Sequence, residues 1–143
     1  MPANSTAEAI VAALKKLGVA RIAMASPYTA ETNAHEAHFL AGRGFEVVAS
    51  AGLSLNTSLE GIQKISRVPP AKVYEHAMSV DRPEAEALLL CCTDFNTFDA
   101  IEVLEDALGK PVLSSNSAML WHTLRSAGIE DRIDGLGMLL RNH

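Results

Sequence analysis

Two adjacent cysteines at the end of an apolar run are the residues of this sequence best suited to chemistry. Cys91 and Cys92 follow the leucine run 88–90, and the polar segment 93–97 leads from them into a helical pattern. A thiolate is a strong nucleophile, and a thiol can also carry a proton. If the run is a buried strand, the thiols lie at its carboxyl end, where open α/β sheets bind ligands. The stretch therefore predicts a cysteine-based site, and the positive end of the following helix would favour the thiolate.

The two cysteines are expected to play different parts. Successive side chains along a strand point to opposite faces, so only one of two neighbours naturally faces a ligand crevice. Cys92 is closer to the start of the next helix, and we expect it to be the functional thiol, with Cys91 packed in the core. The alternative that both are small core residues stays open, because unpaired cysteines are often buried.

Tyr28 and Thr93 are candidate ligand-binding residues at the ends of two expected strands. Tyr28 follows the apolar run 21–25 and the turn Ser26-Pro27. Its hydroxyl either donates a hydrogen bond to a carboxylate or developing oxyanion, or belongs to a ring that covers the sheet edge. Thr93 opens a polar segment that either caps the next helix or offers free N–H groups to a carboxylate.

Alternating strand and helix patterns must position these residues. The patterns predict strands over 21–25, 45–49, 85–91 and 112–113, and helices over 6–17, 30–43, 70–80, 97–108 and 115–127. We interpret 50–68 as a long loop with a helical turn at 59–65, and 138–140 as a strand or a docking segment. This order is typical of βαβ units and predicts one α/β domain over 1–143, a three-layer α/β/α fold with a four-stranded parallel sheet.

The composition restricts the partners that this chain could have. Of its 143 residues 48% are hydrophobic, and its formal net charge of −5 includes no basic cluster. We therefore expect no nucleic-acid partner and, without an apolar run near ~20 residues, no membrane partner. Neighbouring cysteines do not form an ordinary structural disulfide, and no secretory segment is visible, which predicts a reduced, cytoplasmic protein. The five histidines form no ligand set, so no metal site is expected, and no glycine-rich phosphate loop indicates a nucleotide.

Three motifs together give the sequence a family resemblance. They are Ser26-Pro27-Tyr28, Cys92-Thr93, and the stretch from Gly109 to His122 that contains Ser114-Ser115-Asn116. The sequence resembles the aspartate/glutamate racemase superfamily, and within it most closely the branch of maleate cis-trans isomerase and arylmalonate decarboxylase. The resemblance extends over residues 17–140. It implies a fold of two similar α/β domains that enclose the site, of which this chain corresponds to the second.

The resemblance also implies roles for the candidate residues. Cys92 would be the catalytic cysteine, while the Thr93 backbone N–H and the Tyr28 hydroxyl would bind a substrate carboxylate, without any cofactor. The implied function is a cysteine-dependent isomerase acting on a small dicarboxylate or amino acid, most like maleate cis-trans isomerase. The alternatives are an arylmalonate-type decarboxylase, an amino-acid racemase or, in another class, a catalytically incomplete domain that binds a carboxylate or a partner chain.

The partner domain is the remaining expectation. Members of the superfamily use a cysteine, or its replacement, from each of two domains, whereas the resemblance here covers the second domain alone. Activity would therefore require either a separate first domain or a homo-oligomer that brings two copies of Cys92 together. Loss of one oxyanion donor typically lowers an enzymatic rate by roughly 10²–10³-fold, so we expect an isolated monomer to be a poor catalyst.

Overall fold

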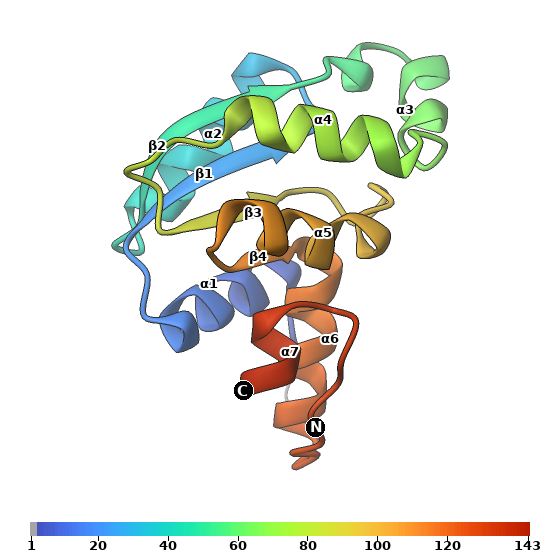
Figure 1. Ribbon diagram of the computed structural model, residues 1–143. Helices are drawn as coiled ribbons and strands as arrows, with labels where there is room; N and C mark the ends of the chain where they lie inside the picture. The colour runs from blue at the N-terminus through green and yellow to red at the C-terminus, as the bar shows by residue number, and fades with distance from the viewer. Residues whose placement is uncertain (1–2) are drawn as a thin grey trace.

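A four-stranded parallel sheet forms the centre of the molecule. The computed structural model describes residues 3–143. The sheet has the order β2-β1-β3-β4, and neighbouring strands pair in parallel (Figure 1). Its strands are β1 (Arg21–Ser26), β2 (Glu46–Gly52), β3 (Ala87–Leu90) and β4 (Val112–Ser114). The predicted four-stranded parallel sheet is confirmed.

Helices cover both faces of this sheet, so the predicted three layers are confirmed. One face packs against α1 (Thr6–Leu17), α2 (Ala30–Ala41), α6 (Ser115–Ser126) and α7 (Met138–Asn142). The other face packs against α4 (Pro70–Val80) and α5 (Phe98–Leu108), with α3 (Leu59–Ile65) beside them. In Figure 1, α4 lies above the sheet and α1 lies below it.

Local capping explains where the helices that flank the site begin. The Ser5 hydroxyl accepts a hydrogen bond from the Glu8 amide at 3.2 Å, and the Glu8 carboxylate accepts from the Ser5 amide at 3.4 Å. Ser114 and Ser117 form the equivalent pair at the start of α6. Such reciprocal caps satisfy amide groups that a helix end otherwise leaves without acceptors. The sequence predicted both helix starts.

The fully buried strand β3 contributes side chains to the core on both faces of the sheet and leads to the two cysteines. Leu88 and Leu90 pack toward α4 and α5, while Leu89 packs toward α1 and α6. Cys91 packs on the same side of the sheet as Leu89, and Cys92 packs on the same side as Leu90, although β3 itself ends at Leu90. The alternation of a strand thus sends the two thiols toward opposite layers.

Two segments differ from the sequence-based expectation. The strand expected over 45–49 extends to Gly52 as β2, and the 3-10 helix η1 (Leu55–Thr57) follows it in the segment interpreted as a loop, whereas the helical turn predicted at 59–65 is confirmed as α3. Residues 138–140 belong to the helix α7 and not to a strand, because both carboxylate oxygens of buried Glu105 accept from the Met138 amide at 2.9 Å. Leu139 and Leu140 enter the core, so the segment docks as the alternative interpretation predicted.

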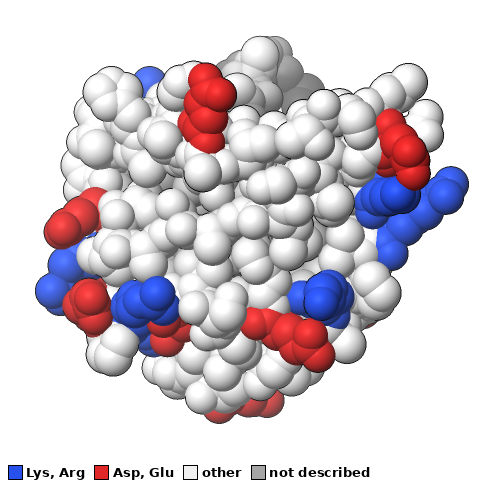
Figure 2. Space-filling view, turned by 90° about the horizontal axis from the view of Figure 1, so that it is seen from above, with Lys and Arg blue, Asp and Glu red and all other residues white. Residues whose placement is uncertain are grey.

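The charges on the surface mix the two signs. Seen from above, acidic and basic side chains stand around the border of the molecule, and the centre of this face is uncharged (Figure 2). The excess of negative charge is therefore not gathered into one patch on this face. None of the helices within residues 3–143 combines the length and the apolar character that crossing a bilayer requires.

Candidate functional site

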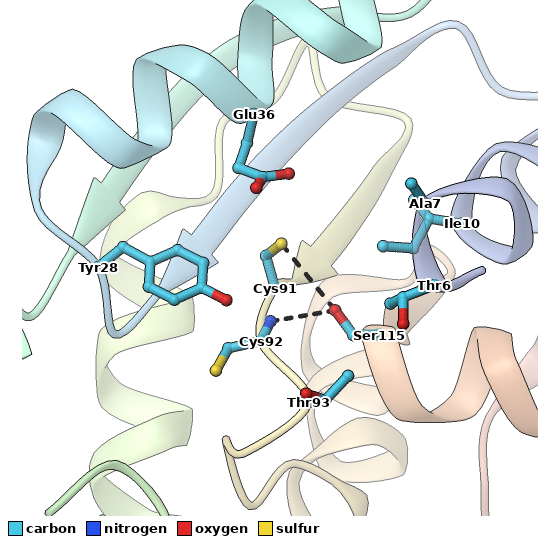
Figure 3. A pocket seen from close by; sticks show the side chains of 9 residues that line it. All are labelled: Thr6, Ala7, Ile10, Tyr28, Glu36, Cys91, Cys92, Thr93 and Ser115. Atoms are coloured by element: carbon cyan, nitrogen blue, oxygen red, sulfur yellow. Dashed lines mark hydrogen bonds between the residues drawn. The ribbon is translucent and has the colours of Figure 1, made fainter. Parts of the chain in front are cut away.

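A pocket of about 250 Å³ lies at the carboxyl ends of β1 and β3. Its lining comes from α1, α2, the turns that follow the two strands, and the first residue of α6 (Figure 3). The lining residues are Thr6, Ala7, Ile10, Tyr28, Glu36, Cys91, Cys92, Thr93 and Ser115. The structure thus brings the three predicted site residues, Tyr28, Cys92 and Thr93, to one pocket. It also adds residues that the sequence analysis did not select.

Both cysteines line this pocket, which differs from the expectation that Cys91 only packs in the core. The side chains are 5% and 7% exposed, and both thiols are free. In Figure 3 the Cys91 sulfur points toward Glu36, whereas the Cys92 sulfur points away from Ser115. The reason for the difference is position: the pocket lies beyond the last residue of β3, where side chains from either face of the sheet reach the same edge.

The electrostatic surroundings of Cys91 keep its thiol protonated. Burial raises the pKa of Cys91 to about 12, and the Glu36 carboxylate adds to this shift. The Ser115 hydroxyl, with its Oγ 3.9 Å from the Cys91 sulfur, opposes the shift by donating a hydrogen bond. Because the thiolate is the nucleophilic form, Cys91 is suited to hold a proton and not to attack a substrate at neutral pH.

Cys92 adopts a strained backbone conformation. Its φ of 124° lies where residues with a side chain are rare. The Ser115 hydroxyl accepts from its amide at 3.0 Å, and the Phe95 amide donates to its carbonyl oxygen at 3.2 Å. Such strain persists only where surrounding contacts hold the backbone in place, and it is concentrated at functional sites.

The position of Cys92 relative to helix α5 corrects one argument from the sequence. Helix α5 begins at Phe98 and Thr97 is its N-cap, so a turn separates the Cys92 thiol from the positive helix end. Among the described residues no side chain caps α5, so capping by Thr93 or its neighbours is also wrong. The segment 92–95 folds into its own turn before the helix starts.

Ser115 is a site residue that the sequence analysis did not select, because serines between a strand and a helix are typical of a helix cap. Ser114 caps α6 together with Ser117, which leaves the hydroxyl of Ser115 free. That hydroxyl accepts from the Cys92 amide and donates to the Cys91 sulfur. A complete capping pair beside a further serine was the signal that could have identified it.

Close backbone packing fixes the position of Tyr28. The Ser26 hydroxyl accepts from the Tyr28 amide at 3.0 Å and donates to the Asn33 side-chain oxygen at 2.5 Å. A Cβ atom at Gly52 would overlap the Tyr28 carbonyl oxygen, so this close approach requires glycine. Burial raises the pKa of Tyr28, and Cys92 adds to the increase. The phenol therefore stays neutral and can donate a hydrogen bond.

A second set of contacts fixes the start of α2. The Asn56 side-chain oxygen accepts from the Thr29 amide at 2.7 Å, and its Nδ2 donates to the Thr32 hydroxyl at 3.0 Å. The Leu55 amide donates to the Pro27 carbonyl oxygen at 2.8 Å. The loop after β2 therefore supports the helix beside the pocket, although Asn56 does not line the pocket itself.

Thr93 lines the pocket. Its side chain is exposed, and its carbonyl oxygen accepts from Asn116 Nδ2 at 2.9 Å. Within residues 3–143 no protein acceptor is assigned to the Thr93 amide. This N–H group is therefore available to a ligand, and a carboxylate is the kind of acceptor that binds strongly to such a donor.

Glu36 is the second residue that the sequence analysis missed. It lies on α2 three positions after Asn33, and residues at this spacing share one face of a helix. The buried Asn33 faces the end of β1 through its bond to Ser26, and Glu36 reaches the pocket from the same side of α2. His35 and His38 are exposed on α2. Among the described residues no group of three His, Cys, Asp or Glu side chains is arranged to hold a metal ion.

Comparisons with known proteins identify the family. The family model for arylmalonate decarboxylase matches residues 1–140. The maleate isomerase of Alcaligenes faecalis is 28% identical over 141 residues, which are 98% of this chain and 54% of that protein. The arylmalonate decarboxylase of Bordetella bronchiseptica is 31% identical over 130 residues, which are 90% of this chain and 52% of that protein.

A solved structure agrees with these matches. A mutant of the Nocardia farcinica maleate cis-trans isomerase, with a covalently bound succinylcysteine intermediate, superposes with a TM-score of 0.89 at 28% identity. The match covers 97% of this chain and 56% of that one. The chain spans about half the length of the curated relatives it matches. The predicted branch is confirmed, and the chain belongs to the arylmalonate decarboxylase family.

Proposed function

We propose that this chain is a cofactor-independent, cysteine-dependent isomerase of a small carboxylic acid, most like maleate cis-trans isomerase. The observation that carries the proposal is the meeting of Cys92, Tyr28 and Thr93 at one pocket, where the Thr93 amide has no assigned protein acceptor within residues 3–143. Family membership supports it, since one relative of similar structure holds a succinyl group on cysteine. The free thiols favour a reducing compartment, so we place the protein in the cytoplasm.

Each proposed role follows from the chemistry of the group. The Cys92 thiolate adds to one carbon of the double bond, and the electron pair of that bond moves to the carbon beside the carboxylate. The Thr93 amide and the Tyr28 hydroxyl stabilise the resulting negative charge on the carboxylate oxygens. An acid then protonates that carbon, which gives a thioether with a single bond about which the substrate rotates. After the rotation, removal of a proton from that carbon expels the Cys92 sulfur and restores the double bond in the other geometry.

A second polypeptide surface is part of this proposal. Because the chain spans about half the length of its relatives, residues 1–143 would correspond to the second domain of a two-domain protein. The acid and base that complete the reaction would come from a separate first domain or from a second copy of the chain. The half-length match also favours a second candidate function, a domain that binds a carboxylate or a partner chain without turnover.

Turnover by matched cysteine variants tests the proposal. Wild type, Cys92→Ala and Cys91→Ala are incubated with maleate, aspartate and an arylmalonate, and the products are followed by nuclear magnetic resonance. We expect wild type to convert maleate, Cys92→Ala to lose roughly 10³-fold or more in rate, and Cys91→Ala to retain most of it. Equal turnover by wild type and Cys92→Ala would refute the catalytic role. Absence of turnover in all three would favour the binding domain.

A further inference from the structure

A second pocket, of about 420 Å³, lies beside the loop that follows β2. Its lining residues are Leu53, Leu55, Lys64, Arg67, Val68, Pro69 and Lys72. None of these residues lines the pocket that contains the two cysteines. We call this second pocket the basic groove. Its described lining combines an apolar surface with cationic side chains and includes no carboxylate, a combination for which the isomerase chemistry has no use.

The basic groove carries positive charge that the protein itself does not neutralise. Lys64 already has a partner, because its Nζ lies 2.6 Å from the Glu60 Oε1. Arg67 and Lys72 are exposed and take part in no ion pair in the part of the chain that the structure describes. The groove therefore attracts an anion, although the whole chain has a net charge of −5. A guanidinium group such as that of Arg67 can bind both oxygens of a carboxylate.

The remaining surface of the basic groove suits a hydrocarbon chain. Leu53, Leu55 and Val68 are half-buried, and Pro69 immediately precedes α4. An apolar ligand that contacts these side chains would remove their exposed surface from water, which favours binding. A small, fully polar anion would leave that surface exposed. The groove therefore favours a ligand with one charged end and one apolar end.

Contacts below the basic groove hold its walls in place before a ligand binds. The Leu53 amide donates to the Ser26 carbonyl oxygen at 3.1 Å. The Leu55 amide donates to the Pro27 carbonyl oxygen at 2.8 Å. Helix α3 approaches the same loop so closely that a Cβ atom at Gly61 would overlap the Leu55 carbonyl oxygen. A site formed in advance requires little ordering of the protein when the ligand binds, and this favours affinity.

We propose that the basic groove is a second ligand site, which binds a carboxylate that carries an apolar chain. The carboxylate pairs with Arg67 and Lys72, and the chain lies against the leucines and Val68. This inference goes beyond the proposed function and does not depend on it, because the groove contains none of the residues that were given a catalytic or substrate-binding role. A small dicarboxylate lacks the apolar chain, so the two sites take different ligands.

Nuclear magnetic resonance titration of the ¹⁵N-labelled full chain tests the inference at pH 7 and constant ionic strength. The probe is hexanoate. Acetate provides the carboxylate without the chain, and hexan-1-ol provides the chain without the charge. We expect hexanoate to bind with a Kd on the order of 1 mM and roughly 10-fold more tightly than either comparison compound, because both ends of the ligand contribute. The largest shifts should occur at the amides of Leu53, Leu55 and Lys72.

Two double variants show whether the charges of the basic groove are responsible. Arg67→Gln combined with Lys72→Gln should weaken hexanoate binding roughly 10-fold and leave hexan-1-ol binding unchanged. Lys16→Gln combined with Arg132→Gln is the matched control, because it removes one lysine and one arginine that are exposed outside the groove. This control should bind hexanoate as wild type does.

Several results would overturn the inference. They are hexan-1-ol or acetate binding as tightly as hexanoate, an equal effect of the two double variants, and shifts confined to residues 91–93. Absence of hexanoate binding up to roughly 50 mM would overturn it as well, because that limit lies far above the expected Kd. None of these results bears on turnover by Cys92, so the failure of this inference and the failure of the proposed function are distinguishable.

Discussion

Replacing Cys92 by glycine is expected to stabilise the fold relative to alanine, which reverses the usual order of these two residues. The φ of 124° at Cys92 strains any residue that has a Cβ atom, and strain of this kind costs about 1–3 kcal/mol. Alanine keeps the Cβ and the strain, whereas glycine removes both. Because both variants lose the buried sulfur, their difference isolates the contribution of the backbone.

The magnitude follows from two opposing contributions. At ordinary backbone angles, glycine in a strand is about 0.5–1 kcal/mol less stable than alanine, because its unfolded chain is more flexible. Subtracting this loss from the relief of strain leaves Cys92→Gly more stable than Cys92→Ala by about 1 kcal/mol. Cys91 supplies the control, because it lacks a positive φ and its amide donates to the Ala25 carbonyl oxygen at 2.9 Å. At position 91, the glycine variant should be less stable than the alanine variant.

Urea unfolding followed by circular dichroism measures the four free energies of unfolding under one condition. We expect the glycine-minus-alanine difference to be positive at position 92 and negative at position 91. A negative difference of the same size at both positions would refute the reasoning, because the Cys92 backbone would then store no strain. In that case, the backbone conformation that places this thiol at the pocket would not lower the free energy of unfolding.

Three further predictions concern residues that support the site and the tail. Gly52→Ala should destabilise the fold by about 1–3 kcal/mol in urea unfolding, because the new Cβ overlaps the Tyr28 carbonyl oxygen, whereas Gly42→Ala, whose Cβ meets only ordinary contacts, should change stability little. Ser115→Ala should cost about 1–3 kcal/mol by the same measurement, since the buried Cys92 amide loses its acceptor, and an unchanged stability would contradict that contact. Burial raises the pKa of Glu105, so its contribution to stability is largest below the ordinary carboxyl pKa and is lost as pH rises through the raised value. Wild type should therefore gain stability relative to Glu105→Gln as pH falls from neutral toward that ordinary pKa, and a constant difference across the titration would refute this assignment.

The sequence was sufficient to predict the layers and most element boundaries, because those depend on local patterns. Alternating apolar runs predicted the four strands, and the helix starts predicted at 6 and 115 agree with α1 and α6. Motif position also brought Tyr28, Cys92 and Thr93 to one sheet edge, as the pocket shows. Their roles in binding and catalysis remain predictions.

The features that could not be predicted depend on contacts between distant segments. Ser115 reaches the Cys92 amide only because β3 and β4 are neighbours, and Glu36 meets the pocket only because α2 packs against the same sheet edge. The tail formed a helix where a strand was also considered, since the Met138 amide finds its acceptor on Glu105 of α5. A local pattern alone does not determine contacts between segments so far apart, although the serine beside the Ser114–Ser117 capping pair was a partial signal for Ser115.

Mass spectrometry of the chain after incubation with an unsaturated dicarboxylate tests the central claim most directly. Maleate added to the folded protein should leave a succinyl adduct on a single sulfur, and fragmentation between the two neighbouring residues identifies which one. The account predicts the adduct on Cys92, no adduct on Cys91, and no adduct in Cys92→Ala, with the urea-unfolded chain as the control for unassisted addition. An adduct on Cys91, or equal labelling of both cysteines in the folded chain, would contradict the assignment of Cys92 as the reactive thiol.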